Sequence, residues 1–240
     1  MINKLKSLSV FFPIYNEEQN IPLFIKEAQL VLPKVAKKYE IIIVDDGSTD
    51  NSLKIANKYE KEYSNIKVVR HQKNQGYGAA LKTGIKNTSH KWVFYTDGDL
   101  QFDIAQIEKF TKYVSDFKVI IGYRANRDEG GFRSFNAWLW KIYIGLLYRV
   151  GVKDIDCAFK LLDGELIRSL DLISSGAFLS TEILYKLKKR GLKFMQIPVE
   201  HKPRIYGEPT GANIKVILRA LKDSLLLYLR IKFNNHHSKP

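Results

Sequence analysis

The chain has 240 residues, and its 45% hydrophobic content suits one α/β domain with a buried core, which excludes a wholly disordered protein. Its 39 Lys and Arg residues outnumber 25 Asp and Glu residues, and the net charge of +14 predicts an anionic partner: nucleic acid, an acidic membrane surface or a phosphorylated substrate. The single cysteine, Cys157, excludes an internal disulfide and a cysteine-rich zinc site and favours a reducing compartment.

Short apolar runs alternate with amphipathic stretches through the first half of the chain. The pattern predicts strands at Ser7–Ile14, Glu40–Val44, Ile66–Arg70, Lys91–Thr96 and Val119–Gly122, and helices at Pro22–Lys38, Ser52–Tyr63, Ala79–Lys86 and Ile104–Val114. Continuous β-branched runs are typical of parallel strands buried on both faces, with the intervening helices as covers. We therefore expect a doubly wound α/β sheet, whose ligands bind beyond the carboxyl ends of the strands.

The second half of the chain breaks this rhythm. Helices are expected at Phe135–Val150, Thr181–Arg190 and Asn213–Phe233, and strands at Cys157–Leu162 and Phe194–Val199. No internal repeat or low-complexity linker divides the chain, so residues 1–233 are expected to form one domain, followed by a flexible tail at 234–240.

The strongest local motif is Asp97-Gly98-Asp99-Leu100-Gln101, directly after a predicted strand. Two carboxylates separated by a glycine can converge on one hard cation, and the Gln101 amide can add an oxygen ligand. A solvated Asp-Gly turn is the alternative. A second acidic turn at the equivalent place, Asp45-Asp46-Gly47-Ser48-Thr49-Asp50, favours a binding site, although Ser48 to Asp50 also suit a helix cap.

A glycine-rich loop, Asn74-Gln75-Gly76-Tyr77-Gly78, follows the third predicted strand. It lacks the Gly-Lys-Ser/Thr ending of a P-loop, and its glycine spacing does not match the dinucleotide-binding fingerprint. A close strand-to-helix turn explains Gly76 and Gly78 equally well. The loop therefore disfavours both a P-loop ATPase and a Rossmann dehydrogenase.

Taken in this order and spacing, the motifs resemble the family 2 glycosyltransferases of the GT-A fold, specifically the dolichol- and polyprenyl-phosphate mannose or glucose synthases. The resemblance covers roughly residues 7–210 and is carried by Pro13 to Glu17, Val44 to Asp50, Asn74 to Gly78, Asp97 to Gln101, Gly122 to Arg124, Asp154 to Lys160, Glu182, and Pro198 to Arg204 with Gly207. It implies a Rossmann-like, mixed but mostly parallel sheet and a C-terminal amphipathic helix. A nucleotide-binding half would cover about residues 7–123, and an acceptor- and membrane-facing half about 124–233.

The resemblance also implies roles for individual residues. It places Pro13, Tyr15 and Glu17 around the nucleoside, and Val44 and Asp46 at the base or ribose, with Asp45 beside them. Asp97, Gly98, Asp99 and Gln101 match the sugar-diphosphate site, where Asp97, Asp99 and Gln101 would bind Mg²⁺ or Mn²⁺. Arg124, Arg133 and Arg204 match basic residues near the donor and acceptor phosphates. Asp99, Arg124 and Arg204 are the residues expected to carry catalysis.

One stretch departs from the family pattern. Relatives often follow the Arg204 position with Gly-x-Ser-Lys, whereas this chain has Gly207-Glu208-Pro209-Thr210. Because the lysine is missing, the sequence does not fix the donor-phosphate contacts at that end of the site, nor the identity of the donor.

The reaction implied by the resemblance is inverting transfer of a hexose from a nucleotide sugar, of the UDP-glucose or GDP-mannose type, to a polyprenyl or dolichyl phosphate. A divalent cation can stabilise the leaving nucleoside diphosphate. A phosphate monoester has a second pKa near ~6, so it arrives ionised and needs little help from a base. The alternative is a glycan-elongating family 2 transferase with a hydroxyl acceptor. That enzyme would want a general base, for which Asp156 is the candidate, unless Asp156 only stabilises a turn.

The stretch Asn213–Phe233 separates an apolar face from a basic one. The apolar positions are Ile214, Ile217, Leu218, Leu221, Leu225, Tyr228 and Leu229, and the basic side carries Lys215, Arg219 and Lys222. Such a helix can lie in an anionic membrane interface, and ordinary packing on the core is the alternative. Phe135–Val150, with Trp138, Trp140 and several tyrosines, is a second candidate for interfacial docking.

The remaining partners and the location follow from absent signals. No signal-peptide core follows Met1, and no uncharged apolar run reaches ~18 residues, so a cytoplasmic protein, peripheral on a membrane, is expected. No helix-turn-helix, RNP-type or zinc-finger pattern supports nucleic-acid binding, which is not expected. A non-catalytic sugar-nucleotide sensor is the third class that the sequence leaves open.

Overall fold

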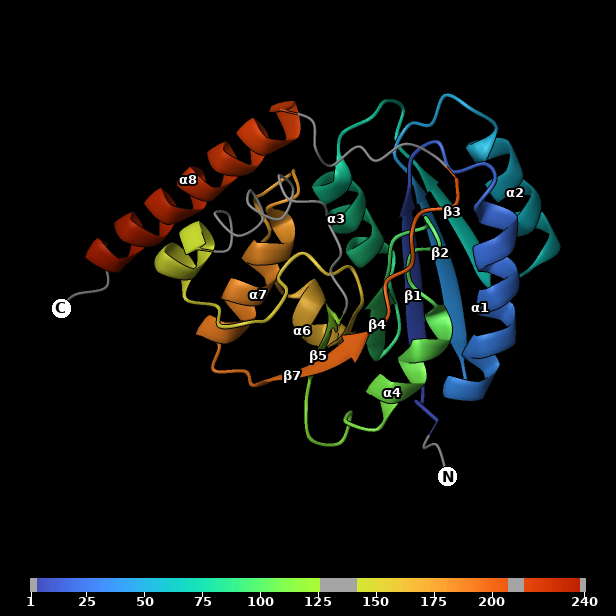
Figure 1. Ribbon diagram of the computed structural model, residues 1–240, viewed down its shortest axis with the longest axis horizontal. Coiled ribbons are helices and arrows are strands. Elements are labelled where there is room, and N and C mark those ends of the chain that lie inside the picture. Colours follow the sequence, from blue (N-terminus) through green and yellow to red (C-terminus); the bar gives the residue numbers. More distant parts are fainter. Residues whose placement is uncertain (1–3, 126–141, 207–213, 238–240) are drawn as a thin grey trace.

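The computed structural model describes residues 4–125, 142–206 and 214–237. Its central layer is one sheet of seven strands, which are β1 (Leu8–Ile14), β2 (Tyr39–Asp45), β3 (Ile66–Arg70), β4 (Trp92–Tyr95), β5 (Val119–Arg124), β6 (Lys160–Asp163) and β7 (Phe194–Val199). Their order is β3-β2-β1-β4-β6-β5-β7, and β6 runs antiparallel to both of its neighbours. The expectation of a mixed, mostly parallel sheet is therefore confirmed (Figure 1).

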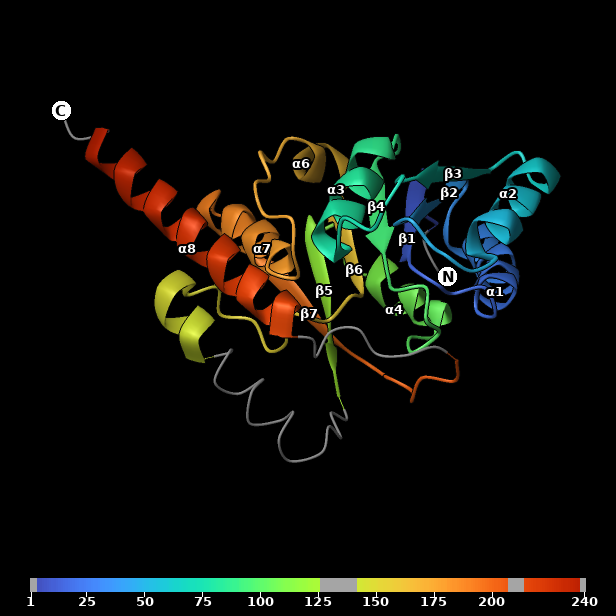
Figure 2. The same ribbon diagram turned by 90° about the horizontal axis from the view of Figure 1, so that it is seen from above.

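Helices cover both faces of the sheet (Figures 1 and 2). They are α1 (Ile21–Val35), α2 (Ser52–Glu62), α3 (Tyr77–Asn87), the 3₁₀ turn η1 (Ile104–Gln106), α4 (Ile107–Thr111), α6 (Gly164–Arg168), α7 (Leu179–Lys189) and α8 (Ile214–His237), and residues 142–148 are also helical. α1, α2 and α4 pack on one face, and α3, α6, α7 and α8 on the other. Because helices pack on both faces of the sheet, the strands are apolar on both sides.

The alternation of side chains in β1 shows how one strand serves two cores. Val10 and Phe12 pack with α1 and α4, whereas Phe11, between them, packs with α3 and α7. All three side chains are almost completely buried. Successive side chains of a strand point to opposite faces, so a parallel strand between two helical layers needs apolar residues at every position.

Several predicted elements differ from those observed. The strand expected at Cys157–Leu162 runs instead from Lys160 to Asp163, because its pairing with β4 and β5 begins only at Lys160. The helix expected at Ile104–Val114 is a 3₁₀ turn followed by only five α-helical residues. The final helix continues to His237, into the segment expected to form a flexible tail. Arg133, Trp138 and Trp140 lie outside the described residues.

Helix α8 lies along α7 and presents leucines to the outside. Leu218, Leu225 and Leu226 are 59%, 55% and 50% exposed, which confirms a separate apolar face and argues against core packing for these side chains. Arg219, assigned to the basic side of this helix, turns its guanidinium inward to Ser175 and the backbone of Gln75 and so is not available for a membrane surface.

The tyrosines expected to dock at a membrane interface were also misplaced. Tyr143 and Tyr148 both hydrogen-bond to Ser224 of α8, and Tyr148 is buried. Ile142 and Leu146, in the same helical segment, are the exposed apolar side chains there. Within the part of the chain that the structure describes, no helix is long and apolar enough to cross a membrane.

Candidate functional site

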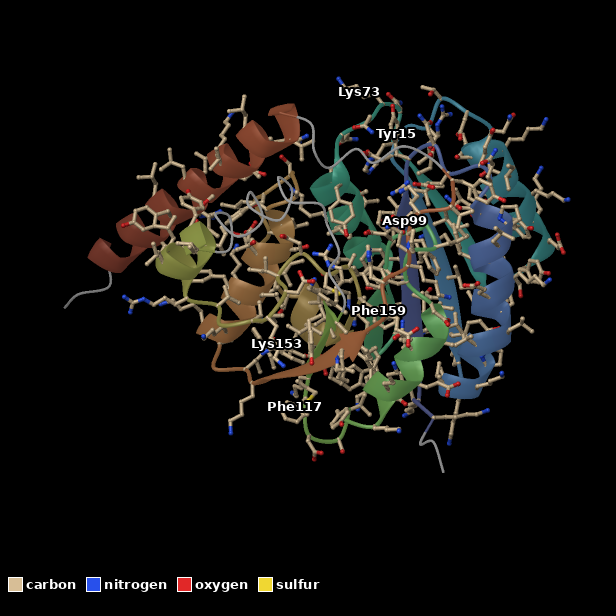
Figure 3. The ribbon with its side chains drawn as sticks, viewed as in Figure 1. Tyr15, Lys73, Asp99, Phe117, Lys153 and Phe159 are labelled. Atoms are coloured by element: carbon tan, nitrogen blue, oxygen red, sulfur yellow. The ribbon has the colours of Figure 1, made fainter. Side chains whose placement is uncertain are left out.

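The sequence motifs meet at one edge of the sheet, where the parallel strands have their carboxyl ends. β1 lies between β2 and β4, so chain order reverses at this strand. Such a switch point is where open α/β sheets bind ligands. Tyr15 and Asp99, which follow β1 and β4, lie toward this edge, and Phe117, which precedes β5, lies at the opposite end (Figure 3).

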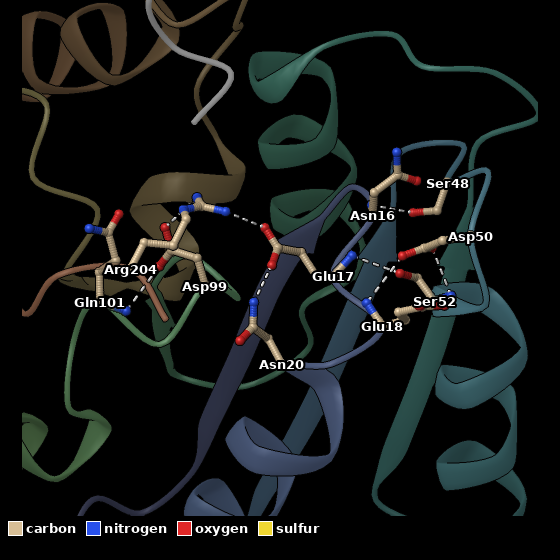
Figure 4. A network of polar contacts seen from close by, with 10 residues as sticks. All are labelled: Asn16, Glu17, Glu18, Asn20, Ser48, Asp50, Ser52, Asp99, Gln101 and Arg204. Carbon is tan, nitrogen blue, oxygen red and sulfur yellow. Dashed lines mark hydrogen bonds and ion pairs between the residues drawn. The ribbon is translucent and has the colours of Figure 1, made fainter. Parts of the chain in front are cut away.

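An arginine joins two acidic residues across this edge (Figure 4). Arg204 donates from Nη1 to Glu17 Oε1 at 3.0 Å and from Nη2 to Asp99 Oδ2 at 2.7 Å. The Asn20 amide donates to the other Glu17 oxygen. Burial raises the pKa of Glu17, while its bonds to Asn20 and Arg204 oppose that shift. Arg204 therefore brings the loop after β1 and the acidic turn after β4 into one cluster.

The segment after β7 carries Arg204 to this position. Its backbone is fixed to the acidic turn by two bonds: Lys202 N donates to Gln101 O at 2.7 Å, and Gln101 Nε2 donates to Lys202 O at 3.1 Å. A backbone bridge between Phe102 and His201 extends the contact. The side chain of Gln101, expected as a cation ligand, thus also secures the segment that delivers Arg204.

The acidic turn has an unusual backbone. Leu100 has a φ of 60°, in the left-handed region that costs free energy for a residue with a Cβ atom. Asp99 Oδ1 accepts from Gln101 N at 3.1 Å and so closes the turn over Leu100. At Gly98 a Cβ atom would lie 2.8 Å from Ile14 Cγ2, which explains the need for glycine between the two carboxylates. The hydrogen bonds of Asp99 and Gln101, on either side of Leu100, stabilise this strained backbone conformation.

The donor chemistry of this turn fits a divalent cation. Asp97 Oδ1 is buried and has no hydrogen-bond partner, although Tyr77 hydrogen-bonds to the same carboxylate. Burial raises the pKa of Asp97, and the nearby charge of Asp99 raises it further. A cation would satisfy the orphaned oxygen and offset the repulsion between the two carboxylates. The described residues hold no cluster of three or more His, Cys, Asp or Glu suited to a metal, so the pair would need the Gln101 amide or a substrate to complete the coordination.

The two aspartates of the second acidic turn, Asp45 and Asp46, make different contacts. The carboxylate of Asp46 accepts from Gln75 N at 2.9 Å, from Gly76 N at 2.8 Å and lies 2.7 Å from His71 Nδ1. It therefore anchors the glycine-rich loop, a structural role that the sequence did not suggest. Asp45 accepts from Ser48 N with one oxygen, while its other oxygen is buried without a partner.

The other predicted nucleoside residues border this turn. Pro13 and Val44 are paired in register across β1 and β2, and Tyr15 is half-buried in the loop that follows. Ser48 does not cap α2, because its hydroxyl accepts from Asn16 N at 2.9 Å and so ties the two loops together. Only Asp50 supports the capping interpretation, since its carboxylate accepts from Ser52 N at 2.9 Å (Figure 4).

Arg124, at the end of β5, forms a bidentate ion pair with Asp154. Nε and Oδ2 are 2.7 Å apart, Nη2 and Oδ1 are 3.0 Å apart, and both side chains are largely buried. A paired guanidinium has a fixed orientation, so Asp154 decides where the remaining donors of Arg124 point. Asp156, the candidate base, is exposed two residues further on.

Lys160, the last residue of the motif Asp154 to Lys160, is completely buried, which the sequence did not suggest. Lys160 Nζ donates to the carbonyls of Ile155 and Cys157, which fixes the segment that carries Asp154. Burial lowers the pKa of Lys160, while Asp97, Asp154 and other neighbouring acids oppose the shift. A lysine directly after Cys-Ala-Phe, at the start of an apolar strand, was the signal that could have revealed it. The Cys157 thiol itself is buried, and its pKa is raised to about 12, which makes it unreactive.

Comparisons with known proteins agree with this geometry. The family model described as glycosyl transferase family 2 matches residues 9–184. The chain is 31% identical to dodecaprenyl-phosphate galacturonate synthase of Rhizobium johnstonii, over 69% of this chain and 50% of that protein. It is 32% identical to mouse dolichyl-phosphate beta-glucosyltransferase, over 95% of this chain and 76% of that protein. The chain thus spans half of the first relative and about three quarters of the second.

Solved structures share the architecture at lower identity. Glucosyl-3-phosphoglycerate synthase from Mycobacterium tuberculosis, in complex with Mn²⁺, UDP and glucosyl-3-phosphoglycerate, superposes with a TM-score of 0.68 at 20% identity, covering 93% of this chain and 80% of that one. Mannosyl-3-phosphoglycerate synthase from Rubrobacter xylanophilus gives 0.72 at 19%, covering 98% and 76%. These likenesses confirm the GT-A fold. Because the family model covers most of the chain, the chain belongs to glycosyl transferase family 2.

Proposed function

We propose that this protein transfers a hexose from a nucleotide sugar to a polyprenyl or dolichyl phosphate, with inversion at the anomeric carbon. The observation that carries the proposal is the bridge from Glu17 through Arg204 to Asp99, which joins the predicted nucleoside and diphosphate sites. Relatives named for dodecaprenyl-phosphate and dolichyl-phosphate substrates support a lipid-phosphate acceptor. Solved neighbours in complex with UDP support a nucleotide donor.

On the donor side, Asp97 and Asp99, with the Gln101 amide, would hold Mg²⁺ or Mn²⁺. The unpartnered oxygen of Asp97 supports this assignment, as do the neighbours solved with Mn²⁺. A bound cation would offset the negative charge that develops on the leaving nucleoside diphosphate. The unpartnered oxygen of Asp45 supports a contact with the base or ribose, whereas Asp46 would act by holding the loop beside them.

On the acceptor side, the arginines supply charge and orientation. Arg204 presents a planar fork between the two predicted subsites, and Arg124 is oriented by Asp154. Arg133 is a further candidate from the sequence. An ionised phosphate needs positioning and charge neutralisation more than a base, which is what such a set of arginines provides.

The test is transfer of radiolabelled sugar from a panel of nucleotide sugars to a short polyprenyl phosphate, with the matched polyprenol as control. We expect product with the phosphate only, formed in the presence of Mg²⁺ or Mn²⁺. Product formed only with hydroxyl acceptors, and lost in Asp156→Asn, would instead establish the glycan-elongating alternative. Absence of any transfer, with nucleotide-sugar binding retained, would favour a sensor.

The protein would meet its acceptor as a peripheral protein on the cytoplasmic face of a membrane. The outward face of α8, defined by Leu218, Leu221, Leu225, Leu226 and Leu229, offers exposed apolar area. Lys222 and Arg230 are exposed on the same helix, and the net charge of +14 favours an anionic surface. Apolar area flanked by basic residues is the composition of helices that bind membrane interfaces.

Replacing Leu225 and Leu226 together with glutamine should therefore reduce flotation with vesicles of phosphatidylglycerol and phosphatidylcholine by about tenfold, given ~2 kcal/mol for each buried leucine at most and incomplete insertion. Lys222→Gln should weaken only the part of binding that salt screens. Leu30→Gln is the matched control, because Leu30 is 61% exposed on α1, away from this face. Equal flotation of the double variant and the Leu30 variant would contradict membrane docking through α8.

A further inference from the structure

The inner face of α8 carries buried polar residues beside the apolar Ala220 and Leu227, which pack in the core. Asp223 and Ser224 are buried, while the leucines described above point outward. A helix that packs only for stability places its apolar stripe inward. The buried polar groups of α8 therefore need hydrogen-bond partners, and those partners show which loops the helix contacts.

Arg219 and Asp223, one helical turn apart, form hydrogen bonds with two loops. Arg219 Nη1 donates to the carbonyl of Gln75 at 2.8 Å, and Nη2 and Nε donate to Ser175 Oγ at 2.8 and 3.2 Å. Asp223 Oδ2 accepts from Ser175 N and Gly176 N, both at 2.9 Å. These bonds define what we call the α8 clamp: Arg219, Asp223, Gln75, Ser175 and Gly176.

The two loops are in direct contact with each other. Ala79 N donates to Ser175 O at 3.1 Å, and a Cβ atom at Gly78 would collide with the carbonyl of Gly176. At Gly76, which has a φ of 97°, a Cβ atom would lie 2.8 Å from Arg219 Nη1. Gly76 is therefore required by its positive φ, and Gly78 by the close approach of the 175–176 backbone, which was not visible in the sequence.

The opposite side of the same loop belongs to the candidate site. Asp46 accepts from the amides of Gln75 and Gly76, while Arg219 binds the carbonyl of Gln75. The next residue, Tyr77, hydrogen-bonds to the carboxylate of Asp97. The loop is thus fixed between a site residue and α8, and its tyrosine reaches a predicted cation ligand.

We propose that Arg219 and Asp223 are positioning residues for donor binding: through the α8 clamp they hold residues 75–77 in the conformation that orients Tyr77 and Asp97 toward a nucleoside diphosphate and its cation. This inference rests on the proposed function. It gives α8 a second role, independent of any contact that its outer face makes.

The test compares Arg219→Met, which keeps the aliphatic length, with Arg219→Lys, which keeps the charge. Arg190→Met is a matched control, because Arg190 also binds a serine hydroxyl, Ser169 Oγ at 2.6 Å, and a backbone carbonyl, at 3.0 Å, but at the far end of α7. Calorimetric titration with UDP and with GDP, each with Mn²⁺, measures the dissociation constant. Amide hydrogen exchange of residues 75–79 and the melting temperature are measured on the same variants.

We expect Arg219→Met to weaken nucleotide binding about tenfold and to accelerate exchange in residues 75–79, with Arg219→Lys in between and Arg190→Met within twofold of the wild type. Faster exchange with unchanged affinity would overturn the proposal, because loop order would then not matter to the donor. Unchanged hydrogen exchange in residues 75–79 together with an unchanged nucleotide affinity would also overturn the proposal. If the wild type binds neither UDP nor GDP, the proposed function fails and the clamp proposal fails with it, a result distinct from the other two.

Discussion

Asp99→Asn is expected to lower the rate of sugar transfer by roughly two to three orders of magnitude, the scale seen when one group that stabilises developing charge is removed. The substitution removes a carboxylate charge from the predicted cation site and keeps the shape of the side chain. The asparagine oxygen can still accept from Gln101 N, so the turn over Leu100 should survive. Initial rates at saturating donor, together with titration of Mn²⁺, measure the effect.

Asp103→Asn is the matched control for this prediction. Asp103 is also an aspartate in a turn after β4, but it caps η1 and forms a long, exposed ion pair with Lys202 Nζ at 3.9 Å. We expect its variant to retain the wild-type rate and Mn²⁺ affinity. Rates at the wild-type level in Asp99→Asn, or undiminished transfer by the wild type in excess chelator, would contradict a cation-dependent mechanism.

Arg204→Lys is expected to lower turnover with lipid phosphate by about tenfold to a hundredfold while changing nucleotide affinity by less than about threefold. The physical reason is the geometry of the fork. Two nitrogens of Arg204 reach Glu17 and Asp99 at once, and a single ammonium cannot span both carboxylates while also facing an acceptor. The turnover number is measured against the polyprenyl phosphate, and nucleotide affinity by calorimetry.

Lys202→Gln tests whether the effect belongs to Arg204 or to the segment after β7 in general. The Lys202 side chain is exposed, and only its backbone contacts Gln101, so we expect nearly normal kinetics. Equal losses of nucleotide affinity and turnover in Arg204→Lys would show that Arg204 acts on the donor alone, and an unchanged rate would remove it from the site.

The local pattern of the sequence determined the sheet and the place of the site. Apolar runs such as β1 and β2 must be buried on both faces, and short-range periodicity suffices to show that. The acidic turns follow their strands directly, so parallel strands had to bring Asp45 and Asp97 to a common edge. The order of the motifs then indicated family 2, which the family comparison confirmed.

The tertiary structure alone decided how the polar residues are paired. Asp46 anchors the glycine-rich loop. Arg204 joins Glu17 to Asp99, and Asp99 lies 105 positions before Arg204 in the chain. Such pairs leave no periodic signal, because their partners come from different elements.

The orientation of α8 was likewise undetermined by its own sequence. Its exposed leucines lie on one face, and Arg219, Asp223 and Leu227 lie on the other, and local spacing does not say which face meets the protein. In the folded chain Asp223 accepts from the amides of Ser175 and Gly176, Arg219 donates to the carbonyl of Gln75, and Ala220 and Leu227 pack in the core on the same side of the helix. Sequence periodicity predicts the faces of this helix, and hydrogen bonds to two distant loops together with apolar packing on the core determine which face is buried.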